Sequence, residues 1–256
     1  MIIPEFLVTD KVAIVTGSRR GIGKATALAL ARKGADVALS GLNHMEGAVA
    51  VAEEIKAMGR RSVAVKMDAS NYSDVQIGFA TIKNELGPVN ILVNNAALMN
   101  HNVTIAKTTI EEWDYEVKLC LNSAFYCIKE VWADMCAAKW GRIVNITSVA
   151  GILGGFGQTS YGAAKAGLIS LAKSVALEGA RFNITANCVL VGISSTDATA
   201  KLPPAVLEKV EKRTAIGRPA TPEEIAGAVV YLTSDEAAYM TGAVMNMLGG
   251  IDLFVF

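Results

Sequence analysis

Short apolar segments alternate with longer amphipathic segments along most of this chain, and this alternation constrains the fold more than any other feature. The short segments are rich in β-branched and aliphatic residues and predict strands at 12–16, 37–40, 62–66, 90–94, 142–147 and 185–189. The longer segments predict helices at 22–33, 44–58, 73–86, 110–138 and 160–180. Continuous apolar strands that alternate with helices are typical of a parallel sheet covered on both faces.

No low-complexity linker interrupts the alternation, so we predict one α/β domain over residues 1–256, built on a single doubly wound (Rossmann) parallel sheet. The pattern breaks between 193 and 221, where Pro203, Pro204 and Pro219 surround a polar helix. Long segments that interrupt a regular strand–helix pattern often cover a binding cleft. We therefore expect a substrate lid at about 193–215.

A glycine-rich turn joins the first predicted strand to the first predicted helix. Gly17 permits the tight turn, Gly21 lets a cofactor approach the backbone, and Gly23 allows close packing of helix on strand. A helix N-terminus presents free N–H groups to a pyrophosphate. A lone glycine repeat is a weak signal, but its position between strand and helix predicts a dinucleotide site. The residues expected to bind it are Gly17, Ser18, Arg19, Arg20, Gly21, Ile22 and Gly23.

The end of the second strand bears on the choice of cofactor. An acid there would bind the ribose 2′-hydroxyl of NAD, but the chain has Ser40 followed by Gly41. Asp36 is five residues before Gly41, roughly 16 Å away along a strand. Because no carboxylate would repel a 2′-phosphate and the turn carries two arginines, we predict a preference for NADP and expect Ser40 to bind the cofactor. NAD is the alternative, with Ser40 and Asn43 as its ribose contacts.

Tyr161 and Lys165 are four residues apart near the start of a predicted helix, so they share a face. Ser148 follows a predicted strand, thirteen residues before Tyr161. Taken alone, the pair could be surface residues and the serine a helix cap. Beside the glycine turn, the three residues indicate a site for proton transfer at an oxygen atom, with Tyr161 as acid and base and the Lys165 ammonium favouring its phenolate.

With these motifs in order, the chain resembles the classical short-chain dehydrogenase/reductase family, nearest to its 3-oxoacyl-[acyl carrier protein] reductase branch. Tyr161-Gly-Ala-Ala-Lys165 matches the YxxxK motif, and Asn94-Asn95-Ala96-Ala97 is similar to the family's NNAG sequence. The resemblance implies catalytic roles for Ser148, Tyr161, Lys165 and Asn122, with Ser148 binding the substrate oxygen and Asn122 holding a relay water. It also implies cofactor contacts from Asp68, Asn95, Ala96, Tyr161, Lys165, Gly192 and Thr196.

The implied activity is hydride transfer between a nicotinamide cofactor and a ketone or secondary alcohol, in a homo-oligomer (dimer or tetramer). Two alternatives remain open: a nucleotide-binding sensor or scaffold without turnover, and a cofactor-dependent dehydratase or epimerase on the same fold. The chain departs from the family pattern at Val191, Ala97 and Leu248, where proline, glycine and aspartate are usual. Because of these departures, the sequence predicts neither the conformation of the cofactor loop nor the identity of the substrate.

The resemblance implies a small carbonyl or alcohol substrate as the partner, and composition argues against nucleic acid and membranes. Lys plus Arg and Asp plus Glu both number 24, so no basic field exists to attract nucleic acid or an anionic membrane. The N-terminal residues lack the basic region of a signal peptide, and no apolar run reaches the ~20 residues of a membrane span. Four cysteines without zinc-type spacing suggest reduced thiols and a cytoplasmic location.

Other residues predict packing rather than chemistry. The two histidines, His44 and His101, are far apart in the sequence, so we expect no metal site. Cys120, Cys127 and Cys136 recur at near-helical spacing, which predicts helix packing. Three tryptophans are expected in the core or in subunit contacts, namely Trp113, Trp132 and Trp140.

Overall fold

A computed structural model of the chain, which describes residues 5–97, 103–196, 199 and 204–253, contains one seven-stranded sheet in the order β3-β2-β1-β4-β5-β6-β7. Every pairing between neighbouring strands is parallel. The strands are β1 Val12–Val15, β2 Asp36–Gly41, β3 Ser62–Lys66, β4 Ile91–Asn94, β5 Gly141–Ser148, β6 Ile184–Val191 and β7 Val244–Met247. The predicted doubly wound α/β fold is confirmed.

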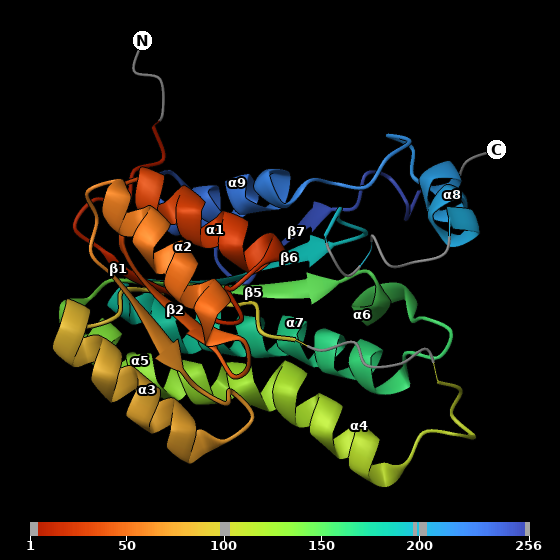
Figure 1. Cartoon of the computed structure of the whole chain (residues 1–256), viewed down its shortest axis with the longest axis horizontal. Helices are drawn as coiled ribbons and strands as arrows, with labels where there is room; N and C mark the ends of the chain where they lie inside the picture. The colour runs from red at the N-terminus through yellow and green to blue at the C-terminus, as the bar shows by residue number, and fades with distance from the viewer. Residues whose placement is uncertain (1–4, 98–102, 197–198, 200–203, 254–256) are drawn as a thin grey trace.

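Helices cover both faces of the sheet (Figure 1). One face carries α1 Gly21–Arg32, α2 Met45–Ala57 and α9 Pro222–Thr233, and the opposite face carries α3 Tyr72–Leu86, α4 Ile110–Val117, α5 Ser123–Ala138 and α7 Thr159–Gly179. The short α6 Ala150–Leu153 and the helix α8 Pro204–Arg213 lie at the end of the molecule toward which the strand arrows point.

The sheet separates two apolar clusters, one under each layer of helices. The first packs Val15, Val37 and Val189 of the sheet against residues of α1, α2 and α9. The second packs the alternate strand residues, such as Ile14 and Ile143, against α3, α5 and α7. Because both faces of the central strands are buried, these strands are apolar throughout, which is the reason that their sequence pattern predicted them.

The structure differs from the predicted elements in two places. The helix expected at 110–138 is interrupted by a π-helical turn, η1 Lys118–Asn122. Two elements near the C-terminus, α9 and β7, were not predicted. The start of α9 has a clear local signal, because Thr221 and Glu224 form a capping box around Pro222. By contrast, β7 is a short edge strand whose residues are only partly buried, so its pattern is weak.

The topology creates a crevice at the carboxyl edge of the sheet. The connection after β1 passes over one face of the sheet, whereas the connection after β4 passes over the other. The direction in which successive strands are added to the sheet therefore reverses between these two parallel neighbours. Ligands of doubly wound proteins bind outside the carboxyl ends of the strands at such a switch point. The glycine-rich turn follows β1 and Asn95 follows β4, so both predicted motifs lie at this crevice.

Candidate active site

The glycine-rich turn is fastened to the end of β4. Asn95 donates from Nδ2 to the carbonyl oxygens of Thr16 and Gly17, at 2.9 and 3.1 Å. The Thr16 hydroxyl accepts from the backbone N–H groups of Asn95 and Ala96, at 3.0 and 2.9 Å. Gly17 has a φ of +65°, and a Cβ there would lie 2.9 Å from the Ala96 Cα atom. Only glycine can provide both the left-handed conformation and this close approach.

The start of α1 is suited to a pyrophosphate. No side chain caps its N-terminus, and its first turn holds no acidic residue. The N–H groups of the first turn therefore retain their capacity to bind an anion, and the helix dipole favours negative charge at the same point. The residues present fit the phosphate groups of a dinucleotide.

A groove of two connected parts runs from this turn across the strand ends. One part, of about 220 Å³, is lined by Gly17, Arg20, Gly21, Ile22, Gly23, Asn95, Ala96, Ala97 and Thr196. The other, of about 270 Å³, is lined by Gly17, Arg19, Arg20, Ser40, Gly41, Leu42, Asn43, Met67, Asp68, Ala69, Ala96, Ala97, Tyr115 and Leu119. Most of the predicted cofactor residues thus line one of these two adjoining parts, which share Gly17, Arg20, Ala96 and Ala97.

Four predicted contacts line neither part of the groove: Tyr161 and Lys165, described below, and Ser18 and Gly192. Ser18 is completely buried, lines neither part of the groove, and its hydroxyl has no hydrogen-bond partner among the residues that the structure describes. The backbone N–H of Gly192 donates to the carbonyl of Met247 at 3.2 Å, which ties this residue to β7. Their roles toward a cofactor stay predictions.

Sequence analysis missed two groove residues on α4 and η1. Tyr115 and Leu119 are four residues apart, so they lie on one side of the helical segment and line the groove together. Their spacing is visible in the sequence, but the sequence does not say that this side of the helix faces the groove.

The groove has a basic turn and no acid at the end of β2. Gly41 is the last residue of β2 and lines the groove, together with Arg19 and Arg20. Asp36, at the other end of β2, forms ion pairs with Arg60 at 3.0 Å and with Arg61 at 2.8 Å. Burial raises the pKa of Asp36, but hydrogen bonds and charge from the two arginines outweigh it and hold the pKa below its ordinary value. The Asp36 carboxylate is therefore paired with two arginines at the end of β2 that is far from the ribose position.

The three predicted catalytic residues Ser148, Tyr161 and Lys165 come together beyond the end of β5. Lys165 is 2% exposed, and its Nζ donates to the carbonyl of Ile146, two residues before Ser148, at 2.8 Å. The same ammonium lies 5.6 Å from the centre of the Tyr161 ring. Lys165 therefore links the helix that carries Tyr161 to the strand that ends at Ser148.

The turn after Ser148 packs directly on α7. The Ser148 hydroxyl accepts from the backbone N–H of Ala150 at 3.2 Å, which orients the serine. A Cβ on Gly151 would lie 2.9 Å from backbone atoms of Lys165 and Ala166, so only glycine allows this approach. Ser148 and Tyr161 are both partly exposed.

Asn122 lies in a helical segment that contacts α7 through a neighbouring residue. It is the last residue of the π-helical turn η1 and is partly buried. Its neighbour Leu121 packs against Gly167 of α7, which brings η1 to the catalytic helix. No hydrogen bond within the described part of the chain joins Asn122 to Ser148, Tyr161 or Lys165. π-Helical turns are frequent at functional sites, and the turn itself had no sequence signal.

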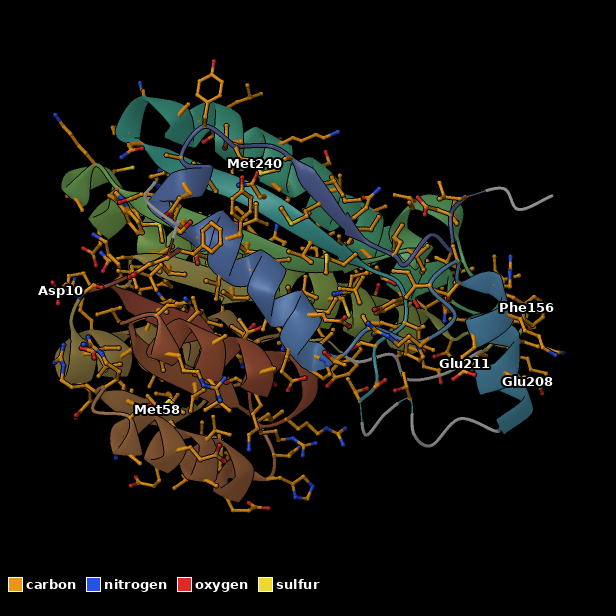
Figure 2. The ribbon with its side chains drawn as sticks, turned by 90° about the horizontal axis from the view of Figure 1, so that it is seen from above. Asp10, Met58, Phe156, Glu208, Glu211 and Met240 are labelled. Atoms are coloured by element: carbon orange, nitrogen blue, oxygen red, sulfur yellow. The ribbon has the colours of Figure 1, made fainter. Side chains whose placement is uncertain are left out.

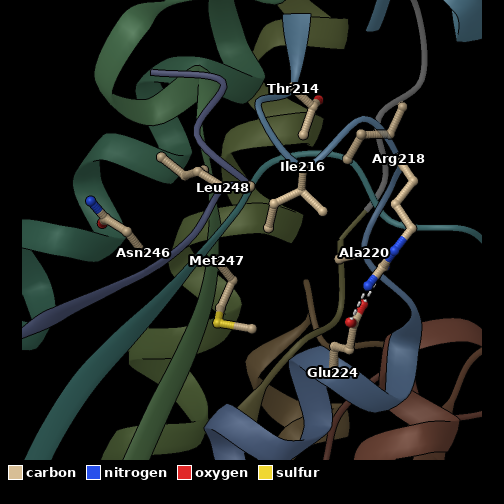
Figure 3. A pocket seen from close by; sticks show the side chains of 10 residues that line it. Thr214, Ile216, Arg218, Ala220, Glu224, Asn246, Met247 and Leu248 are labelled. Carbon is tan, nitrogen blue, oxygen red and sulfur yellow. Dashed lines mark hydrogen bonds and ion pairs between the residues drawn. The ribbon is translucent and has the colours of Figure 1, made fainter. Parts of the chain in front are cut away.

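The predicted lid region contains α8 and is anchored at both ends. Ser194 pairs with Ala220 in an isolated parallel bridge, and Ile216 donates its N–H to the carbonyl of Gly249 at 3.1 Å. Between these anchors lies a pocket of about 370 Å³ with apolar walls that include Ile193 and Ile216, shown in Figure 3. Lid residues 197–198 and 200–203 lie outside the described residues.

An ion pair at the rim of this pocket joins Arg218 to Glu224 at 2.7 Å (Figure 3). The Arg218 hydrogen bonds hold the pKa of Glu224 at about 2, with further help from the Thr221 backbone N–H. Arg218 also donates to the carbonyl of Pro219. Because its guanidinium is already paired, Arg218 fixes the base of the lid to α9.

The packing predicted for the cysteines and tryptophans is confirmed in part. Cys127 is fully buried and Cys136 packs against the same cluster, as helix packing requires. Trp132 and Trp140 pack against the two core clusters, whereas Trp113 is 38% exposed and is not a core residue. His44 pairs with Glu46. His101 lies outside the described residues, among which no group of His, Cys, Asp and Glu could hold a metal ion.

Comparisons with known proteins agree with this geometry. A family model described as Enoyl-(Acyl carrier protein) reductase matches residues 16–252. A 3-oxoacyl-[acyl-carrier-protein] reductase of Synechocystis sp. is 40% identical over 247 residues, which cover 96% of this chain and 98% of the relative. The reductase FabG of Pseudomonas aeruginosa is 41% identical over 241 residues, 94% of this chain and 97% of the relative.

Solved structures share the fold over its whole extent. A protein from Sinorhizobium meliloti 1021, provisionally assigned as a short-chain alcohol dehydrogenase, has a TM-score of 0.93 and 31% identity, over 98% of this chain and 100% of its own. A protein from Agrobacterium tumefaciens, provisionally assigned as a gluconate dehydrogenase, has a TM-score of 0.93 and 29% identity, over 98% and 99%. No helix in the described part of the chain is long and apolar enough to cross a membrane.

The site combines a groove suited to a dinucleotide at the end of β4 with a serine, a tyrosine and a lysine near the end of the neighbouring strand β5. This combination fits hydride transfer from a nicotinamide, which requires a proton partner at the substrate oxygen. From the match over residues 16–252 and the identity with full-length relatives, the chain belongs to the short-chain dehydrogenase/reductase family and is an NAD(P)-dependent oxidoreductase that transfers hydride to or from a small-molecule substrate.

Proposed function

We propose that the protein reduces a ketone to a secondary alcohol, with NADPH as its preferred cofactor and Tyr161 as the proton donor. The observation that carries the proposal is the junction of β5 and α7. There the buried Lys165 ammonium bonds to the carbonyl of Ile146 and lies beneath the Tyr161 ring, next to the strand end that carries Ser148.

Each residue of this junction has a distinct role in the proposed reaction. A bound nicotinamide supplies the hydride. Ser148 donates a hydrogen bond to the substrate carbonyl, while Tyr161 delivers a proton to the same oxygen as it gains charge. The positive charge of Lys165 stabilises the phenolate that this transfer leaves. Because Lys165 is buried and fixed to the sheet, little reorganisation accompanies the reaction.

In the proposed mechanism, Asn122 holds a water that relays protons to solvent. The support for this role is its place in η1, which packs against α7 through Leu121. If Asn122 holds the relay water, Asn122→Ala should slow turnover about tenfold or more, and Cys120→Ala in the same turn should not. An unaffected Asn122→Ala variant would remove this residue from the catalytic group.

The preference for NADPH is supported by charge. Arg19 and Arg20 line the part of the groove that also holds Ser40 and Gly41, and the nearest acid of β2 is paired with two other arginines. A 2′-phosphate at this point would meet positive charge and no carboxylate from β2. Asp68 lines the same part of the groove, and its carboxylate accepts from Ser70, at 2.7 Å from the hydroxyl.

A 3-oxoacyl thioester is the substrate class to test first. Two relatives that match nearly the whole chain are described as 3-oxoacyl-[acyl-carrier-protein] reductases. Apolar side chains are also exposed beyond Ser148, with Leu153 at 62% and Phe156 at 87%. Phe156 lies at the α8 end of the molecule, far from Asp10 and Met58 (Figure 2). Such a surface suits an apolar acyl chain better than a sugar.

We further infer that 193–215 acts as a lid within a single domain and that the protein is a homo-oligomer. The two anchors of the lid leave α8 between them as the part that could move. Oligomerisation is supported by α4, which has no buried residue and exposes Ile110, Trp113 and Tyr115. The cysteines are free and mostly buried, which supports a reducing compartment such as the cytoplasm.

Tyr161→Phe tests the proposed function directly. The variant should lose at least about a hundredfold in kcat for NADPH-dependent ketone reduction, because general acid catalysis is removed, while its Kd for NADPH stays within about twofold. Tyr231→Phe is the matched control. Tyr231 belongs to α9, on the opposite face of the sheet from α7, where its ring contacts Phe6, so this variant should keep full activity. A Tyr161→Phe enzyme with most of its kcat would show that another group donates the proton.

A further inference from the structure

A hydrogen bond joins α4 to the residue immediately before the proposed proton donor. The hydroxyl of Ser160 donates to the carboxylate of Glu116, whose Oε2 is the acceptor. Ser160 is 5% exposed and is the second residue of α7, and Tyr161 is the third. The bond therefore acts on the first turn of the helix that carries Tyr161.

The first turn of α7 has little other support from its own sequence. Its N-cap residue, Gln158, makes no side-chain capping bond, and the turn contains no acidic residue. A carboxylate near the first turn of a helix is stabilising, because the N–H groups there are unpaired within the helix and carry partial positive charge. Glu116 supplies this carboxylate from a different helix.

Glu116 also lies next to the cofactor groove. Its neighbour Tyr115 lines the groove with Leu119, whereas Glu116 and Glu112 line a small cavity on the α7 side. Residues 115 and 119 form one side of the helical segment, and residues 112 and 116 form another. The segment thus contacts the cofactor groove with one side and the start of α7 with the next.

Tyr161 and Lys165 are held by different means. Lys165 is fixed to the sheet through the carbonyl of Ile146, one turn further along α7. Within the described residues, the first turn of α7 makes no comparable bond to the sheet. Its bond to Glu116 instead joins it to a neighbouring helix. A phenol displaced by about 1 Å would lose much of its efficiency in proton transfer.

We propose that Glu116 and Ser160 form a positioning pair that holds Tyr161 in line with the substrate oxygen. The proposal rests on the proposed role of Tyr161 as proton donor. Neither residue lines the cofactor groove, so their effect should appear in the rate of reduction and leave the binding of both ligands unchanged.

The test is a double-mutant cycle on the full-length protein with Ser160→Ala, Glu116→Ala and the double variant. The readout is the single-turnover rate of NADPH oxidation with a saturating 3-oxoacyl thioester. Each single variant should lose about tenfold, equivalent to about 1.4 kcal/mol of the barrier. The double variant should lose no more than either single variant, because both remove the same bond. The Kd for NADPH and the KM for the thioester should stay within about twofold.

Two further measurements separate positioning from a loss of fold. Glu116→Gln retains an acceptor oxygen for Ser160 and should recover the rate to within about threefold of the wild type. The solvent deuterium isotope effect should rise in Ser160→Ala, because a misplaced phenol makes proton transfer more limiting. Glu112→Gln is the matched control, since Glu112 lines the same cavity but bonds to Thr109 at the start of its own helix. It should keep the wild-type rate.

Several results would overturn the proposal: unchanged rates in both single variants, effects that add in the double variant, or a Glu116→Gln variant as slow as Glu116→Ala. A rise in KM with an unchanged rate would equally reject it. Failure of the proposed function is distinguishable, because it requires that Tyr161→Phe stays active. An inactive Tyr161→Phe together with fast Ser160→Ala and Glu116→Ala variants would reject the positioning pair alone.

Discussion

Gly23→Ala should weaken cofactor binding and lower stability, because the structure leaves no room for one methyl group. A Cβ at this position would lie 2.6 Å from the Asn95 Nδ2 atom, 2.6 Å from the carbonyl oxygen of Gly17 and 2.8 Å from the Ser18 Cα atom. Ordinary contacts begin at 3.4 Å, so the neighbours would have to move by about 0.8 Å. Two of the three are backbone atoms of the turn itself and cannot rotate away.

The energetic cost can be estimated from these contacts. Overpacking typically costs about 1–3 kcal/mol, and the displaced Asn95 would lose one or both bonds to the turn, at about 1 kcal/mol each. Alanine gains about 1 kcal/mol over glycine within a helix. The net loss of about 2 kcal/mol corresponds to a fall in Tm of roughly 4–8 °C for a chain of this length. The shifted turn should raise the Kd for NADPH at least tenfold, or about 1.4 kcal/mol.

Fluorescence titration with NADPH and thermal unfolding without cofactor would measure the two effects. Gly227→Ala is the matched control, because Gly227 is an exposed residue within α9 and a Cβ there meets nothing within 4 Å. This control should raise the Tm by roughly 2–4 °C through helix propensity and leave the Kd unchanged. If Gly23→Ala bound NADPH as tightly as the wild type and unfolded no earlier, the close packing inferred for the turn would be wrong.

Three further outcomes are expected. Gly41→Asp should shift kcat/KM toward NADH, because a carboxylate at the end of β2 accepts from a 2′-hydroxyl and repels a 2′-phosphate; a wild type that already favours NADH would refute the assignment. Asp36→Asn should lower stability at pH 7 by about 1–3 kcal/mol through lost pairs with Arg60 and Arg61. Because the folded pKa of Asp36 lies below its ordinary value of 3.8, its ionised form stabilises the fold above that pH, and the difference from the variant should shrink as the pH falls below it in denaturant titrations. Amide exchange across 193–213 should slow when NADP binds, and strong protection with and without cofactor would indicate a fixed wall instead of a lid.

Local sequence patterns were sufficient to predict the central strands, the glycine turn and the shared helix face of Tyr161 and Lys165. Central strands are apolar throughout because both of their faces are buried, so they could be predicted directly. The glycine turn could be predicted because its glycines form a short run between a strand and a helix. Tyr161 and Lys165 share a helix face by their spacing alone, and the ammonium beneath the ring confirms it. Prediction was poorest for β7, whose partly buried edge position gives no clear pattern.

Tertiary structure decided what lies opposite each of these local features. The π-helical turn at 118–122, the side of α4 that faces the groove through Tyr115, and the bond from Ser160 to Glu116 all depend on how helices pack. Ser160 and Glu116 are 44 residues apart, and no periodicity in the sequence connects them. A hydrophobic pattern determines which side of an element is buried, because burial acts on each side chain separately. Which polar groups meet across two elements is fixed only when the elements pack, because that contact depends on the rotation and offset of both.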